Sequence, residues 1–243
     1  MNFLTSKRSW LLAPVISLLF ALLVTIVCVA LESQTLKITF DNDGHSPVEL
    51  MTLPLFALII PLVWLCPPQA GSIARQARWS ALWTILGGMA IVRETDLHKL
   101  LFANLWPEID NSFTGTVFKM RFLKDGGIPL MPKLFVILFF IAFFVAALIP
   151  LVRYGLPLVK GFFRFEPVAW TMAVFGGVSV VVLTLDRLPS NLLRSGIRVS
   201  RPLLACIKAF EEGGEMLMAL LALLAVLQAH LWFNRRLPGD NEG

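Results

Sequence analysis

The chain has 243 residues, of which 57% are hydrophobic and 15% are charged, and its formal net charge is +5. Soluble domains carry about 25% charged and about 45–50% apolar residues, and one water-soluble core of this size cannot bury so much apolar surface. The composition therefore excludes an ordinary soluble domain and predicts a chain that lipid solvates.

Six apolar segments are candidates for membrane-spanning helices, because about 20 apolar residues cross about 30 Å of hydrocarbon. The first follows Lys7 and Arg8 and is too long for the apolar core of a signal peptide, so we expect a retained helix. The second contains Pro54 and Pro61, and the third is short, so these two are the least regular. We predict an all-α integral membrane bundle of about six transmembrane helices, forming one domain over residues 1–243. The predicted spans are 10–31, 50–66, 79–92, 134–152, 168–185 and 216–233.

Local sequence features predict how some of these helices begin and pack. Small residues let helices approach closely in lipid, so we expect the pairs Gly87-Gly88 and Gly176-Gly177 to lie at helix contacts. The segment Ser200-Arg201-Pro202 is typical of a helix start, with serine as the N-cap and proline in the first turn. The last helix is expected to run unbroken from there to Phe233.

The basic residues predict the orientation of the chain. With six spans both termini lie on one side, and the short segments on that side carry lysine and arginine next to the span ends, where the positive-inside rule acts. We therefore expect both termini to lie in the cytoplasm. Because the positive charge is assigned to these anchors, the expected partner is the lipid bilayer and not nucleic acid. The basic residues concerned are Lys7, Arg8, Arg75, Arg78, Arg153, Lys160, Arg164, Arg235 and Arg236.

Ionisable residues gather at the opposite ends of the predicted spans. They open the second span, close the third and fifth, and precede the last apolar stretch. Ionisable groups near membrane depth are costly, and they are usually paired or functional. We therefore predict that they meet in one polar pocket at the non-cytoplasmic rim of the membrane. The residues are Glu49, Arg93, Glu94, Asp96, His98, Lys99, Asp186, Arg187, Lys208, Glu211, Glu212 and Glu215.

Spacing within this set allows a metal or acid–base site as one interpretation. Glu94 and His98 are four residues apart, and Glu212 and Glu215 are three apart, so each pair shares a helix face. Carboxylate oxygens and an imidazole nitrogen suit Zn, Mn or Fe, and such a divalent metal ion could activate water. The predicted catalytic residues are Glu94, His98, Glu212 and Glu215. The predicted metal ligands are His98, Glu94, Glu215 and Asp186.

Basic residues at the same rim favour a phosphate-bearing substrate. Guanidinium groups bind phosphate through paired hydrogen bonds. The spacing of Arg194, Arg198 and Arg201 predicts one basic stripe on a helix, which could hold an anionic lipid or a polyprenyl phosphate. Ordinary headgroup contacts are a simpler explanation for such a stripe. The predicted substrate-binding residues are Arg93, Lys99, Arg187 and Arg121.

A third interpretation gives the charged residues of the rim a structural role, without catalysis or ligand binding. The basic and acidic residues of the rim could neutralise one another in an ion-pair network that locks helix ends together, and we favour this network over a metal site and over a lipid-phosphate clamp. RETDLHK, residues 93–99, is not an established metal motif.

Two functions therefore remain open. The first is a membrane-embedded, metal-dependent enzyme that acts on or recognises a lipid-linked or phosphate-bearing substrate. The second is a non-catalytic subunit of a transport or envelope-assembly complex, in which the charged cluster is a packing or partner-binding network. A transporter more often shows broken helices with charges near the middle of the bilayer, whereas these charges gather at one end.

Three segments of the chain also carry a family resemblance: DNDGHSPVEL before the second span, RETDLHK after the third and EEGGE before the last. The chain resembles an uncharacterised family of bacterial polytopic inner-membrane proteins with an R-E-x-D-x-H-K segment and a glutamate pair before the last helix. The resemblance covers most of the chain and implies no activity. The matching positions are Glu49, Arg93, Glu94, Asp96, His98, Lys99, Asp186, Glu211 and Glu215.

Overall fold

The structure, a computed structural model, describes residues 4, 6, 8–40, 46–67, 73–95, 104–107 and 120–235. Within these ranges every regular element is a helix, which confirms the predicted all-α class. By its contacts the chain divides into two compact units, Met1–Gly88 with Leu158–Gly243 and Met89–Pro157. Each unit is described by itself below, and a single domain over the whole chain stays a prediction. The helices are η2 (Ser9–Leu11), α1 (Leu12–Ala30), α2 (Ser33–Phe40), α3 (Pro47–Leu65), α4 (Ile73–Glu94), α7 (Met120–Lys124), α8 (Leu130–Phe163), α9 (Pro167–Arg194) and α10 (Arg201–Arg235).

In the described part of the chain, four helices are long and apolar enough to cross a membrane: Ser9–Ala30, Pro47–Leu65, Pro167–Arg194 and Arg201–Leu231. They correspond to the first, second, fifth and sixth predicted spans, and α3 stays continuous through its two internal prolines. The third and fourth predicted spans coincide with shorter apolar stretches, so the count of six is not confirmed. These stretches are Trp79–Val92 in α4 and Leu130–Ala142 in α8.

The candidate spans present apolar side chains on their outer surfaces. On α1, for example, Leu18 is 71% exposed and Val29 is 84% exposed. Large exposed apolar surfaces on a soluble protein mark interaction sites or aggregation hazards. On a helix long enough to span a bilayer they are instead the surface that lipid chains solvate.

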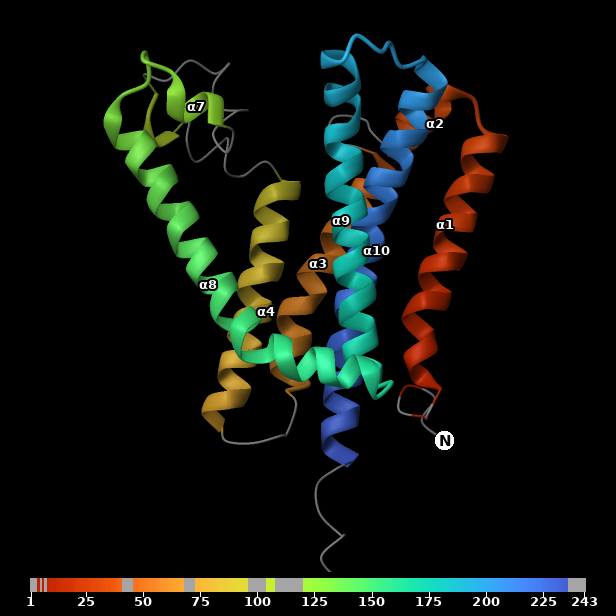
Figure 1. The fold of residues 1–243 in the computed structure, drawn as a ribbon, viewed down its shortest axis with the longest axis vertical. Helices are drawn as coiled ribbons and strands as arrows, with labels where there is room; N and C mark the ends of the chain where they lie inside the picture. Colours follow the sequence, from red (N-terminus) through yellow and green to blue (C-terminus); the bar gives the residue numbers. More distant parts are fainter. Residues whose placement is uncertain are drawn as a thin grey trace, which may run out of the picture. The chain divides into compact units, whose positions relative to one another are not determined.

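Helix α10 is the central element of the first unit. Helices α9, α3, α2 and α1 all contact it (Figure 1). Its alanine-rich middle is almost fully buried: Ala219, Leu221, Ala225 and Ala229 have no exposed surface. The helix begins at Arg201, directly after Ser200, and runs unbroken to Arg235, which confirms the predicted start and continuity of the last helix.

Helices α1 and α10 run antiparallel, and their contacts define the two ends of this unit. At one end, here called the Trp10 end, Gln228 donates a hydrogen bond to the Ser9 carbonyl and accepts one from the Thr171 hydroxyl at 2.6 Å. The other end, here called the Arg201 end, contains α2, the start of α3 and the start of α10 (Figure 1). Ser9 and the last turn of α10 therefore lie at the same end.

Aromatic rings cluster at the Trp10 end. Trp10 lies 5.1 Å from Phe165 and 4.8 Å from Trp170 between ring centroids, and Phe162 stacks on Trp170 at 4.3 Å. The Trp170 indole also donates a hydrogen bond to the Phe162 carbonyl. Tryptophan is enriched where membrane helices meet the headgroups, because its ring is apolar and its N–H is polar. The cluster is therefore typical of a membrane interface.

Adjacent glycines allow the closest helix contacts of α10. A Cβ atom on Gly213 would lie 3.2 Å from the Phe20 ring and 3.3 Å from Val24, both on α1. A Cβ atom on Gly214 would collide with Val182 on α9. The two glycines thus bring α1 and α9 against the central helix at the same height.

The structure differs between the two glycine pairs that the sequence predicted to lie at helix contacts. Gly87 on α4 confirms the expectation, because a Cβ there would lie 3.4 Å from the Phe56 carbonyl oxygen of α3. Gly88, Gly176 and Gly177 have no neighbour within 4 Å of such a Cβ among the described residues. No close helix contact at Gly176 or Gly177 is therefore seen within the described part of the chain, where both residues are exposed on α9.

The described part of the second unit contains a small core of its own. Its buried residues are Phe122 of α7, Ile128 in the turn before α8, and Val136 of α8. Trp106 packs against them. Asp125 stabilises the turn between the two helices by accepting a hydrogen bond from the Gly127 N–H at 2.9 Å, and its carbonyl accepts one from the Lys133 ammonium.

The glycine contacts of α10 make a stability prediction. Replacing Gly214 by leucine forces a side chain into Val182, and such overpacking typically costs about 1–3 kcal/mol. The matched control is Gly176→Leu, which makes the same change in helix propensity on an exposed face. Thermal unfolding in detergent should show a lower Tm for Gly214→Leu only. Equal Tm values for the two variants would contradict the contact.

Candidate functional site

One face of α10 carries the charges that the sequence placed before the last span. Lys208, Glu211, Glu212 and Glu215 lie within two helical turns, and their spacing puts them on the face opposite Gly213 and Gly214. Glu211 and Glu215 are each only 3% exposed. We call these four residues the charged face of α10.

Lys208 neutralises one of these carboxylates. Its ammonium donates a hydrogen bond to Oε1 of Glu211 at 3.0 Å and lies 2.8 Å from Oε2. The lysine side chain is 28% exposed while the glutamate side chain is 4% exposed, so the pair joins a half-exposed cation to a buried anion. A buried carboxylate without such a partner would be strongly destabilising.

Neighbouring helices bring further carboxylates to the charged face. Asp186 of α9 lies within electrostatic range of Glu211, and Glu49 of α3 lies within range of Glu212. Acids from three helices therefore lie within electrostatic range of one another at the Arg201 end of the first unit. Arg187 follows Asp186 on α9 and is exposed.

Glu49 has a structural task. It stands in the first turn of α3, where its Oε2 accepts a hydrogen bond from the Ser46 N–H at 2.9 Å while the Ser46 hydroxyl accepts one from the Glu49 N–H at 3.1 Å. This reciprocal pair is a capping box, which satisfies two backbone donors at a helix start. The Ser46 hydroxyl in turn donates to the Phe40 carbonyl and ties α2 to α3.

The remaining predicted site residues belong to the second unit. Asp96, His98 and Lys99 lie outside the described residues. Arg93 and Glu94 form the end of α4 and Arg121 lies in α7, but their side chains are not among those described. The predicted grouping of Glu94 and His98 with Glu212 and Glu215 therefore stays a prediction.

The same holds for the predicted metal centre. In the ranges that the structure describes, no three His, Cys, Asp or Glu side chains are arranged to hold a metal ion. Asp186 and Glu215 were two of the four predicted ligands, and the set would need His98 and Glu94 to be complete. Of the other histidines, His230 lies at the Trp10 end, where its Nδ1 is 3.0 Å from the Pro67 carbonyl oxygen.

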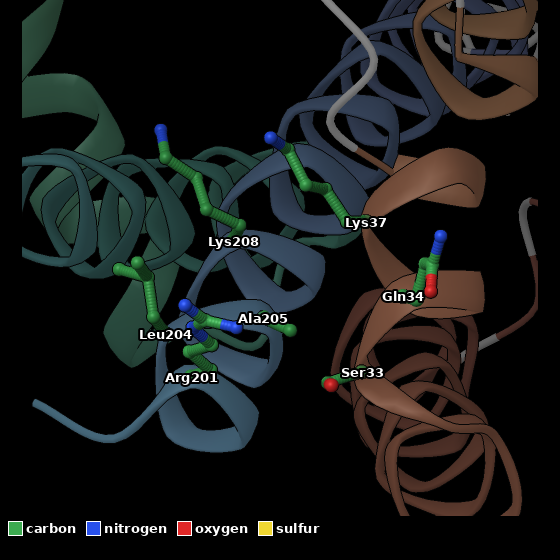
Figure 2. Close-up of a pocket in the computed structure, with 7 residues that line it drawn as sticks. All are labelled: Ser33, Gln34, Lys37, Arg201, Leu204, Ala205 and Lys208. Atoms are coloured by element: carbon green, nitrogen blue, oxygen red, sulfur yellow. The ribbon is translucent and has the colours of Figure 1, made fainter.

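A basic groove lies beside the charged face. It has a volume of about 530 Å³ and is formed by α2 on one side and α10 on the other (Figure 2). Three cations reach it, Lys37 from α2 and Arg201 and Lys208 from α10, and Figure 2 shows Lys37 and Lys208 extending in the same direction. We call it the basic groove. Its lining is completed by Ser33, Gln34, Leu204 and Ala205.

Sequence reasoning missed the contribution of α2 to this groove. Ser33 and Lys37 are four residues apart, as are the buried Leu36 and Phe40, so residues 33–40 form a short amphipathic helix. That spacing was visible in the sequence, but it occupies only two turns within a segment that otherwise reads as a connection between spans.

The predicted arginine stripe is wrong as a single helical feature. Helix α9 ends at Arg194, residues 195–200 are not helical, and α10 starts at Arg201. The break has a local cause, because Gly196 adopts a positive φ of 77°, a conformation that glycine tolerates and that ends helices. Only Arg201 of the three arginines lines the basic groove.

Comparison with known proteins adds no assignment: no protein family, curated protein or solved structure matches this chain.

The Lys208–Glu211 pair predicts that substitutions of its two residues have coupled effects on the free energy of unfolding. Lys208→Met leaves a buried carboxylate without its cation, and hydrogen bonds to charged groups contribute about 1.5–3 kcal/mol. We expect that loss of stability for Lys208→Met, and most of it should return in the double variant Lys208→Met with Glu211→Leu. Unfolding in mixed micelles measures each free energy, with Arg194→Met as a control for removing an exposed cation. Additive effects of the two substitutions on the free energy of unfolding would contradict the ion pair.

Proposed function

We propose that this protein is a polytopic inner-membrane protein that binds the phosphate-bearing headgroup of an anionic lipid in the basic groove between α2 and α10. The observation that carries the proposal is that Lys37 of α2 and Arg201 of α10 line one groove, next to the Lys208 that pairs with Glu211. The substrate class includes phospholipids and lipid-linked phosphates.

The chemistry of the lining supports an anion. Arg201 can offer two parallel N–H donors to phosphate oxygens, and the Lys37 ammonium adds positive charge and further donors. Ser33 and Gln34 add neutral hydrogen-bonding groups. Leu204 and Ala205 make part of the wall apolar, which suits a headgroup whose hydrocarbon chain stays in the bilayer.

The setting of the groove supports a lipid as the source of that anion. The groove is formed where α2 follows the first candidate span and where α10, the last candidate span, begins. Basic residues next to the ends of spans are attracted to anionic headgroups.

The membrane topology belongs to the same proposal. We propose six spans, made of the four long helices together with the apolar parts of α4 and α8, and a cytoplasmic location for the Trp10 end. The arrangement of the first unit supports an even number of spans, because Ser9 and Gln228 meet at one end. Reporter fusions after Arg235 and within residues 41–45 should then report opposite sides of the membrane.

The charged face of α10 admits a second candidate function. The Lys208–Glu211 ion pair and the Glu49 capping box are structural interactions, and they favour a non-catalytic subunit in which this cluster fixes helix packing or a partner. The enzymatic alternative needs Glu94 and His98 to join Glu212 and Glu215. Loss of folding in His98→Ala and Glu215→Ala would favour the packing network, whereas retained folding with loss of a bound metal would favour the enzyme.

The basic groove makes a binding prediction. The double variant Lys37→Gln with Arg201→Gln should bind phosphatidic acid at least about tenfold more weakly than the unmodified protein, because tenfold corresponds to about 1.4 kcal/mol and each charged hydrogen bond contributes about 1.5–3 kcal/mol. Binding is measured on purified protein in phosphatidylcholine nanodiscs that contain increasing amounts of phosphatidic acid.

The matched control for this experiment is Arg194→Gln with Arg198→Gln. It removes the same charge from exposed positions that do not line the groove. The control should retain nearly full affinity. An equal loss in both double variants would mean that general surface charge, and not the groove, attracts the lipid.

A further inference from the structure

The side chains of two cysteines meet between the first and last helices of the first unit. Cys28 of α1 and Cys206 of α10 are neighbours whose side chains interact electrostatically. Both pack against the same buried cluster, which includes Val24, Leu36 and Ala209. Both are free thiols that remain partly exposed, so a reagent can reach them.

The antiparallel register of α1 and α10 explains why these two positions meet. Moving along α1 toward the Arg201 end, each contact on α10 falls correspondingly earlier in the sequence. The Cys28–Cys206 contact continues that progression, and therefore follows from the fit of the two whole helices. The earlier contacts are Ser9 with Gln228, Ala13 with the cluster that contains Leu217 and Leu221, and Val24 with Gly213.

The contact lies next to the basic groove. Cys206 directly follows Ala205, which lines the groove, and Cys28 lies in the last turn of α1, just before the helix that supplies Lys37. A covalent link at this position would hold the corner between α1 and α2 against α10. The third cysteine, Cys66, lies at the far end of α3 and is separate from this pair.

We propose that Cys28 and Cys206 are a dithiol–disulfide pair whose oxidation joins α1 to α10 beside the basic groove. The proposal does not depend on what the groove binds. It assigns a reversible modification site to these two residues.

The oxidant in this step is a disulfide, carried by a small molecule or by a protein. The thiolate of one cysteine attacks the oxidant and forms a mixed disulfide, which releases one thiol of the oxidant. The thiolate of the second cysteine then displaces the other half, so that the Cys28–Cys206 bond forms. The two protons and two electrons of the cysteine thiols leave on the two thiols of the reduced oxidant.

The proposed topology makes such a bond stable in the cell. Disulfides persist in oxidising compartments such as the bacterial periplasm. The Arg201 end, which contains this pair, is the end that we propose to lie outside the cytoplasm. Cys66 lies on the opposite side in that topology, where thiols stay reduced.

Oxidation of the purified full-length protein by dipyridyl disulfide tests the proposal. The protein is reduced, freed of reductant in detergent and exposed to the oxidant, and its tryptic peptides are then mapped by mass spectrometry without reduction. We expect a peptide that contains Cys28 linked to a peptide that contains Cys206, and release of two thiopyridones for the pair. The link should raise the Tm, because it constrains the unfolded chain.

Variants separate the pair from general thiol reactivity. Cys66→Ser should form the link as the unmodified protein does, whereas Cys28→Ser and Cys206→Ser should each leave a stable mixed disulfide on the remaining partner. Unfolding curves of the reduced variants show that each is folded. Mixed disulfides at both positions without a link, a link to Cys66, or full resistance of both thiols to the oxidant would each overturn the proposal.

Discussion

The rest of the first unit depends on the close approach of α1 and α9 to α10 at Gly213 and Gly214. Inside a bilayer, helices gain little by hiding apolar surface from lipid, so they associate through van der Waals packing that small residues permit. The absence of side chains at these two positions leaves room for Phe20 and Val24 on one flank and for Val182 on the other. With larger side chains, α10 could not contact its neighbours at this depth.

The charged residues of α10 follow from the same constraint. The glycines occupy the face that packs against α1 and α9, and helical periodicity puts Lys208, Glu211, Glu212 and Glu215 on the opposite face. That face is not free for solvent, since Glu211 and Glu215 are buried, and Glu211 forms an ion pair with Lys208. Toward the start of α10 this face forms one wall of the basic groove. Arg201 and Lys208 line that wall, and Lys37 of α2 lines the other. One helix therefore supplies both the tightest packing and most of the candidate binding chemistry.

Sequence patterns that depend on one helix alone predicted the structure well. Long apolar runs identified the four helices that can cross a membrane, and the start of α10 after Ser200 was predicted from its local residues. Patterns that depend on a neighbour were less informative. Gly87 faces α3 while Gly176 faces no described residue, and nothing in the glycine pairs themselves distinguishes the two cases. Likewise, a regular arginine spacing suggested one helix, but Gly196 ends α9 within it. Lys37 and the Cys28–Cys206 contact required knowledge of which helices lie side by side.

A crosslinking measurement tests the central claim, that the basic groove holds an anionic phosphate-bearing headgroup, most directly. A photoreactive side chain is placed at Gln34, which lines the groove, or at Ile38, which is exposed on α2 and does not line it. After irradiation in a membrane that contains phosphatidylcholine and a minor share of phosphatidic acid, mass spectrometry identifies the lipid attached at each position. We expect phosphatidic acid to be enriched above its share of the membrane at position 34 and not at position 38. Adducts in the bulk proportions at both positions would contradict the account.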